Sequence, residues 1–501
     1  MMEVSAPPTV PSDGLFAGPS VVDHRTYAKA VAHMRSLGVP LPTFAELAEP
    51  SRAIGPADDP DALMPANLHR IHWYNGSDRR SRVDVPDNLL LTRQLTGVDT
   101  PILVLLGDRF PMIRAHKVLP AYACLVTRLV TGTFDPALDR AVWPSTGNFC
   151  RGGIAVSRAL DCRGIAILPE GMSRERFEWL HARVSDPADV ITTPGTESNV
   201  KEIYDACQEL AEDPRNVILN QFRDFANYLV HFGVTGPAIE RAIIDRQRRG
   251  EVATPRAFVA ASGSAGTLAA GDYLKERFGT ATAAVESVEC PTMLRNGFGE
   301  HNIQGIGDKH IPLIHNVLAT DHVIGVSDAV TDRLNLLFNT DVGRAYLRDR
   351  RMVDDDSMAG LGSLGLSSLC NIVAAIKLVR SLGLGPDDLV ITIATDGSTL
   401  YASEAEIAAA RYFNGTFDEL AAAEVFGEAI LGAGTGDMLE LTTVDRARIF
   451  NLGYFTWVEQ RGVGLEDFET RRSPAFWRSI QASIDAWDAA ITEVNVRAGT
   501  T

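Results

Sequence analysis

Between about residues 100 and 394, short apolar runs alternate with segments that have helical periodicity. The runs at 101–106, 257–261 and 389–394 are almost entirely apolar. A strand that is apolar on both faces is covered on both sides, which is typical of a parallel sheet packed between helices. The chain is therefore predicted to be an α/β protein built on parallel sheets.

The composition narrows the class of protein. The chain has 501 residues, of which 45% are hydrophobic and 22% charged, as in globular proteins with more than one folding unit. Its net charge of −17 argues against nucleic acid as a partner. No apolar run is long enough to span a bilayer, no signal peptide is recognised, and the six cysteines form no Cys-x-x-Cys motif. A cytoplasmic protein without a membrane partner is expected.

Lys117 lies in the apolar stretch 113–120 and directly follows His116. Burial among apolar groups lowers the pKa of a lysine towards the neutral amine, which can form an imine with an aldehyde. The alternative is a solvated surface lysine, since Arg114 and His116 beside it are polar.

A second segment, Ser145-Thr146-Gly147-Asn148, follows a predicted strand at 140–144 and begins a helix. Backbone N–H groups at a helix start, two hydroxyls and an amide could together bind a carboxylate. An ordinary helix N-cap made by Ser145 or Thr146 is the alternative.

A glycine-rich turn at 263–267 joins a predicted strand to a predicted helix, which is where α/β folds bind phosphate. A dinucleotide site uses a similar turn with an acid about 20 residues later, and Glu286 lies at that distance. However, Ala265 and Leu268 occupy the positions where that fingerprint requires glycine. The predicted phosphate cradle consists of Gly263, Ser264, Ala265, Gly266 and Thr267.

Three histidines are grouped between residues 300 and 316, which raises the possibility of a metal site. The spacing of His301, His310 and His315 matches no standard ligand pattern. No metal is therefore predicted, and a loop with hydrogen-bonded histidines is expected instead.

Further segments follow one another in a fixed order along the chain. They are Asn-Gln-Phe at 220–222, Thr-Gly-Pro-Ala-Ile at 235–239, Gly-Ile-Gly at 305–307 and Ile-Ala-Thr-Asp-Gly at 393–397. Together with the three segments above, this order resembles the fold-type-II pyridoxal-phosphate-dependent enzymes. The resemblance is to the cysteine synthase and cystathionine β-synthase branch of the tryptophan synthase β superfamily, and it covers about residues 95–401.

The resemblance implies a two-domain α/β fold with parallel sheets flanked by helices. Residues 95–122 and 233–401 would form the large domain that binds pyridoxal 5'-phosphate. Residues 123–232 would form a small, mobile substrate domain. Residues 1–94 would be an N-terminal extension, and residues 402–501 a mainly helical C-terminal extension.

The resemblance also implies roles for individual residues. Lys117 would form the imine and act as general base. The residues implied to bind the cofactor are His116, Asn148, Asp396 and the cradle Gly263, Ser264, Ala265, Gly266 and Thr267. Those implied to bind the substrate are Ser145, Thr146 and Gln221.

Three positions depart from the pattern of the branch. Ala115-His116 replaces Ser-x before the lysine, and a His-Lys pair is similar to that of the tryptophan synthase β subunit. Phe149 replaces a threonine. Asp396 stands where the synthases have a neutral group facing the pyridine nitrogen, and a carboxylate there would keep that nitrogen protonated. A shift by one residue would place Thr395 there instead, and an aspartate of an Asp-Gly turn is a further alternative for Asp396.

The function implied by the resemblance is β-elimination or β-replacement on a small amino acid of the cysteine, serine or O-acetylserine type. The reaction would pass through an aminoacrylate intermediate, in a homodimer. Asp396 would slightly favour elimination. The alternatives are a non-catalytic binding module that keeps this fold and a nicotinamide-dependent oxidoreductase.

The C-terminal extension carries a periodic apolar seam after a predicted helix start at Ser473-Pro474. The seam is expected either to pack on its own domain or to form a subunit interface. Its residues are Trp477, Ile480, Ile484, Trp487 and Ile491.

Overall fold

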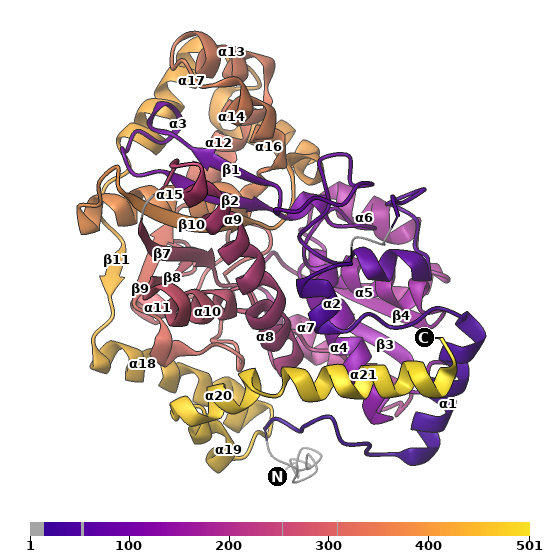
Figure 1. Ribbon diagram of the computed structural model, residues 1–501. Helices are drawn as coiled ribbons and strands as arrows, with labels where there is room; N and C mark the ends of the chain where they lie inside the picture. Colours follow the sequence, from indigo (N-terminus) through magenta and orange to yellow (C-terminus); the bar gives the residue numbers. More distant parts are fainter. Residues whose placement is uncertain (1–14, 52–54, 253, 308, 501) are drawn as a thin grey trace.

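The computed structural model describes residues 15–51, 55–252, 254–307 and 309–500. Two separate sheets, each packed among helices, form the centre of the protein (Figure 1). Within these ranges, no helix is both long enough and apolar enough to cross a membrane.

The larger sheet has seven strands in the order β1-β2-β10-β7-β8-β9-β11. Its five central strands are parallel, whereas β1 and β11 pair antiparallel at the two edges. The prediction of parallel sheets between helices is therefore confirmed, with antiparallel edges that it did not include. The strands are Asn88–Leu91 (β1), Ile102–Leu106 (β2), Thr254–Ala261 (β7), Ala281–Ser287 (β8), His322–Val326 (β9), Asp388–Ala394 (β10) and Met438–Glu440 (β11).

The smaller sheet has four parallel strands in the order β5-β4-β3-β6. All four lie within the segment predicted as the small domain, and that this segment moves as a unit stays a prediction. The strands are Arg140–Pro144 (β3), Arg163–Pro169 (β4), Val190–Thr193 (β5) and Asn216–Ile218 (β6), and the helices between them are α5 (Asn148–Ala159), α6 (Arg174–His181) and α7 (Val200–Leu210).

The large sheet forms because its strands are apolar on both faces. Every residue of β2, Ile-Leu-Val-Leu-Leu, is buried. Removing such side chains from water contributes about 25 cal/mol per Å² of apolar area. Since β2, β10 and β7 are neighbouring parallel strands, the loops that follow them lie at one edge of the sheet.

Helices cover both sheets and build the two extensions (Figure 1). Helix α4 follows Lys117, and α10 follows the glycine-rich turn. Further helices are α3 (Arg93–Thr96), α4 (Val118–Thr131), α10 (Leu268–Phe278), α11 (Thr292–Arg295), α12 (Asp328–Asn339), α13 (Asp341–Asp349), α14 (Asp355–Gly360), α15 (Leu366–Leu382), α16 (Ala402–Phe413), α17 (Glu419–Val425), α18 (Thr443–Tyr454) and α19 (Leu465–Thr470).

One helix begins earlier than its sequence signal predicted. Gly236-Pro237 is a sequence signal for a helix start, but α8 (Phe225–Val230) runs through a π turn into α9 (Gly236–Arg248). Proline removes a helical N–H, so it often marks a helix start. Here the apolar residues of α8 are buried and keep the chain helical, and the wide π turn His231–Thr235 ends just before Gly236-Pro237.

The two extensions pack against each other. Helix α1 (His24–Leu37) lies beside α21 (Ile484–Ala498), and the segment leading to α2 (Phe44–Ala48) bonds to the same helix (Figure 1). The buried Asn495 side chain accepts a hydrogen bond from the Leu41 N–H at 2.8 Å and donates one to the Leu41 carbonyl at 2.8 Å. Residues far apart in the sequence are thus joined by polar contacts inside the protein.

The apolar seam of the C-terminal extension spans two helices rather than one. Helix α20 (Pro474–Gln481) ends before Ser483, whose hydroxyl donates to the Ile480 carbonyl at 2.6 Å and so competes with helix continuation. Trp477, Ile480, Trp487 and Ile491 are all buried against residues of this chain. Packing within the chain is therefore the arrangement that the structure shows.

We predict that Asn495→Ala lowers the free energy of unfolding by about 2 kcal/mol, because it leaves the buried N–H and C=O of Leu41 without partners. Urea unfolding of the full chain measures the change. The control is Thr492→Ala on the same helix, whose hydroxyl is exposed and should change stability by less than about 0.5 kcal/mol. Equal effects of the two substitutions would contradict the prediction.

Candidate active site

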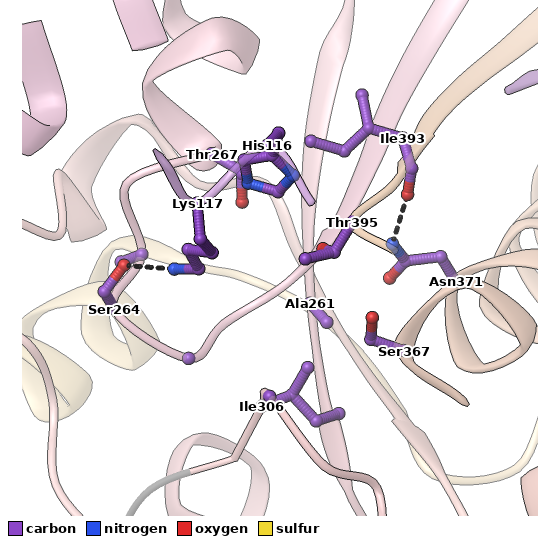
Figure 2. A pocket seen from close by; sticks show the side chains of 13 residues that line it. His116, Lys117, Ala261, Ser264, Thr267, Ile306, Ser367, Asn371, Ile393 and Thr395 are labelled. Carbon is purple, nitrogen blue, oxygen red and sulfur yellow. Dashed lines mark hydrogen bonds between the residues drawn. The ribbon is translucent and has the colours of Figure 1, made fainter. Parts of the chain in front are cut away.

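Lys117 stands at the start of α4, and its amine points into a hollow at the edge of the large sheet where β2, β7 and β10 end (Figure 2). The Nζ atom donates to Ser264 Oγ at 3.1 Å and to Gln221 Oε1 at 3.3 Å. The preceding residue, His116, is fixed by its N–H, which donates to the Thr395 carbonyl at 3.1 Å. The lysine is thus held by segments from three different parts of the chain.

The hollow is lined by residues from several segments of the chain. Most of the predicted cradle and the Lys117 segment face it, together with residues of the 305–306 loop, α15 and the end of β10 (Figure 2). The lining residues are His116, Lys117, Ala261, Gly263, Ser264, Ala265, Thr267, Gly305, Ile306, Ser367, Asn371, Ile393 and Thr395.

Gly266 and Gly263 of the cradle lie so close to neighbouring atoms that a side chain would not fit at either position. A Cβ on Gly266 would lie 2.2 Å from Asn227 Oδ1, and one on Gly263 would lie 2.5 Å from the Gly305 carbonyl oxygen. Asn227 in turn donates from Nδ2 to Ser264 Oγ at 3.0 Å, which orients the hydroxyl that faces Lys117. The turn therefore opens the N-terminus of α10 towards the hollow, where helix geometry favours an anion.

His116 is completely buried, and within the described residues neither of its ring nitrogens has a hydrogen-bond partner. Its ring stacks on Trp73 at a centroid distance of 5.7 Å and meets His231 edge-on at 5.3 Å. Burial first, and then the charges of His231 and Lys117, lower the pKa of His116 well below its ordinary value. The neutral imidazole can therefore donate one N–H bond to a group bound in the hollow.

The Ser145–Asn148 loop lies where β3 passes into α5, with its side chains buried. Ser145 Oγ accepts from the Gly147 N–H at 3.1 Å, and Gly147 has a φ of +144°, a conformation that favours glycine. The Asn148 amide donates from Nδ2 to Asp396 Oδ2 at 2.5 Å. Asp396 thus fixes the loop through its hydrogen bond with the Asn148 side chain.

Asp396 is fully buried but is not among the residues that line the hollow, whereas Thr395 is. The Oδ2 atom of Asp396 also accepts from the Tyr401 hydroxyl at 2.9 Å and lies 3.7 Å from Arg176 Nη2. Burial raises the pKa of Asp396, while the charge of Arg176 and the bonds from Asn148 and Tyr401 act in the opposite direction. Which of the two residues meets a pyridine nitrogen stays a prediction.

Gln221 follows β6 and accepts from Lys117, so the structure brings it beside the hollow with the predicted lysine and cradle. Glu286, the acid considered for a dinucleotide ribose, instead accepts the N–H groups of Met293 and Leu294 at 2.9 and 2.8 Å. Within the described ranges, no group of three or more acidic, cysteine and histidine side chains could hold a metal ion.

Sequence reasoning missed several residues of the site. Trp73 comes from the N-terminal extension, Asn227 from α8 and Glu197 from the loop before α7. Asn227 lies on the helix that follows the Asn-Gln-Phe segment at 220–222, and this nearby segment is a signal that could have pointed to it. We find no local signal for Trp73 or Glu197, because their position depends on long-range packing.

The residues present fit pyridoxal phosphate. The helix start at α10 and the two hydroxyls of the cradle suit its phosphate, and the amine of Lys117 suits its aldehyde. The ring nitrogens of His116 are buried and have no hydrogen-bond partner within the described residues, so a polar group of the cofactor would satisfy one of them. The site thus supplies donors and an amine for each polar part of this cofactor.

The comparisons with known proteins agree with this geometry. Residues 90–333 match the family model "Pyridoxal-phosphate dependent enzyme". The chain is 31% identical over 326 residues to a probable cysteine synthase of Bacillus subtilis, covering 60% of this chain and 94% of the relative. It is 28% identical over 267 residues to a cysteine synthase of Staphylococcus aureus, covering 53% and 76% respectively.

Solved structures share the fold at lower identity. O-acetylserine sulfhydrylase isoform 3 of Entamoeba histolytica aligns with a TM-score of 0.52 and 22% identity over 68% of this chain and 92% of that chain. A hydrogen sulfide-producing enzyme of Fusobacterium nucleatum aligns with a TM-score of 0.51 and 20% identity over 63% and 96%. The chain belongs to the pyridoxal-phosphate-dependent enzymes and is of the cysteine synthase type, which confirms the resemblance, the fold class and the cofactor.

We predict that Gly266→Ala weakens the affinity for pyridoxal phosphate at least about tenfold, or 1.4 kcal/mol. The added methyl group would displace Asn227, and Ser264 would lose the amide that orients its hydroxyl. Titration of the apoprotein with the cofactor, followed by absorbance, measures the affinity. The control is Gly427→Ala, where a Cβ meets nothing within 4 Å. An unchanged affinity for Gly266→Ala would contradict this account of the cradle.

Proposed function

We propose that the protein catalyses β-replacement or β-elimination on a small amino acid of the cysteine, serine or O-acetylserine type, as a lyase or a transferase. The observation that carries the proposal is the position of the Lys117 amine, which contacts the phosphate cradle through Ser264 and the substrate side through Gln221. Cysteine synthase relatives of which the chain covers most of the length support the same reaction class.

Pyridoxal phosphate, when bound, supplies the electron sink that stabilises negative charge on the α-carbon of the amino acid. The residues of this chain bind and orient the reactants around it. Ser145, Thr146 and Asn148 would bind the amino acid carboxylate with hydroxyl and amide donors. Lys117 would remove the α-proton, and its amine is held within reach of the site by Ser264.

Asp396 is proposed to orient Asn148 rather than to meet the pyridine ring. Its Oδ2 atom already accepts from Asn148 and Tyr401, and Thr395 is the residue of this pair that faces the hollow. A carboxylate placed behind the asparagine fixes the amide so that it keeps one orientation when the substrate binds. This role replaces the slight preference for elimination that the sequence suggested for Asp396.

We also expect the protein to be a homodimer and to be located in the cytoplasm. The cytoplasmic location is supported by the six cysteines, all of which are free thiols, as is usual in a reducing compartment. Sedimentation velocity of the purified chain tests the first, and a single species with the mass of one chain would contradict it.

We predict that Lys117→Ala lowers kcat/KM at least about 10³-fold, because the general base and the attachment point are lost together. The assay measures cysteine formed from O-acetyl-L-serine and sulfide, and pyruvate released from L-cysteine. The control is Lys201→Ala, an exposed lysine paired with Asp205 on α7. Retention of wild-type activity by Lys117→Ala would contradict the proposed function.

We predict that Asp396→Asn raises the KM for the amino acid about tenfold and leaves the absorbance maximum of the bound cofactor unchanged. The substitution keeps the shape of the side chain but weakens its hold on Asn148. Steady-state kinetics and the absorption spectrum of the same preparation provide the two readouts. A shifted absorbance maximum with an unchanged KM would instead indicate that the carboxylate acts on the pyridine nitrogen.

A further inference from the structure

Glu197 is a buried acid beside the substrate loop, and the mechanism above does not use it. It lies in the loop between β5 and α7, three residues before the helix begins, and 1% of its surface is exposed. Its Oε2 atom has no hydrogen-bond partner within the described part of the chain. A buried oxygen without a partner requires an explanation, and a ligand group can supply one.

The groups around Glu197 belong to the candidate active site. The Thr146 hydroxyl and the Gly305 backbone N–H interact with its carboxyl, and the charges of Arg176 and Lys117 act on it. Thr146 belongs to the loop assigned to the substrate carboxylate, and Gly305 lines the hollow that Lys117 enters. Glu197 therefore lies at the substrate end of the site.

Burial raises the pKa of Glu197 to about 8, while Thr146, Arg176, Gly305 and Lys117 act to lower it. The side chain is thus mostly protonated at neutral pH and has a hydrogen to donate. A protonated carboxyl near the substrate loop also avoids repulsion between two carboxylates.

Two other buried acids, Glu286 and Asp272, have hydrogen-bond partners within the protein and stabilise its structure. Both oxygens of Glu286 accept backbone N–H groups. Asp272 accepts from the Tyr228 hydroxyl and from the Asn316 amide. Glu197 differs because its Oε2 atom is fully buried and has no hydrogen-bond partner within the described residues, and because the groups near it are those of the active site.

We propose that Glu197 recognises the group on the β-carbon of the amino acid and protonates it as it leaves. The inference rests on the proposed function. As the bond from the β-carbon to the leaving atom breaks, that atom takes the bonding pair and the proton of Glu197, which becomes a carboxylate. In β-replacement, the incoming nucleophile returns a proton to the carboxylate as its bond to the β-carbon forms. In elimination, water returns the proton.

A pair of substrates that differ in the basicity of the leaving group tests this role. Acetate leaves O-acetyl-L-serine without a proton, whereas hydroxide leaves L-serine only with one. We expect Glu197→Gln to lower kcat/KM for pyruvate release from L-serine about 10²-fold or more, and for O-acetyl-L-serine less than tenfold. The wild-type rate with L-serine should fall as the pH rises through about 8, and the variant should lack this fall.

The matched control is Glu202→Gln, which makes the same change at a partly exposed side chain on α7. Equal losses for both substrates, or no loss for either, would overturn the role of Glu197 and leave the proposed function standing. A wild-type enzyme that releases nothing from either substrate would overturn the proposed function and this role with it.

A readout without turnover comes from the stability of the folded holoenzyme. A raised pKa means that the folded state holds a proton that the unfolded chain loses above pH 4.5, so stability falls as the pH rises towards about 8. Glu197→Gln has no proton to lose. The Tm of the variant minus that of the wild type should therefore increase from pH 5 to pH 8, and a constant difference would contradict a buried, protonated Glu197.

Discussion

The pairing of β10 between β2 and β7 is the constraint on which the candidate site depends. Each of these three parallel strands delivers one part of the site to the same edge: the Lys117 segment, the glycine-rich turn and the Thr395-Asp396 segment. Because β10 comes last in the sequence yet lies between the other two, the hollow is complete only when the C-terminal half of the fold has joined the sheet. The contact between Lys117 and Ser264 follows from this arrangement.

A buried cluster of charged and polar side chains connects the two sheets. Arg176 belongs to α6 beside the small sheet, while Tyr401 and Asp396 follow β10 of the large sheet, and the three buried side chains contact one another directly. Burying such groups costs several kcal/mol per ion, which mutual attraction and hydrogen bonds must offset. The same carboxylate holds Asn148, so the polar group that joins the sheets also orients the substrate loop. A change in the relative position of the sheets would therefore move Asp396 and change the orientation of the Asn148 side chain.

The sequence predicted the central strands and most helices because apolar periodicity is a local property. It predicted Lys117, the cradle and the asparagine loop because their chemistry depends on short motifs. It did not predict the edge strands β1 and β11, whose pairing is set by where the extensions fold back. Trp73 and Glu197 were missed for the same reason: each reaches the site through contacts that no neighbouring residue signals. Asp396 was recognised as unusual, but only the fold showed that Thr395 faces the hollow.

Reduction of the holoenzyme with borohydride, followed by peptide mapping, identifies the lysine that binds the cofactor. The amine of Lys117 contacts Ser264 of the cradle and Gln221 beside the hollow, so we expect a pyridoxyl group on the peptide that contains Lys117. The same treatment of Lys117→Ala should leave no labelled peptide. A pyridoxyl group on a different lysine, or a wild-type protein that takes up no label after incubation with pyridoxal phosphate, would contradict the account.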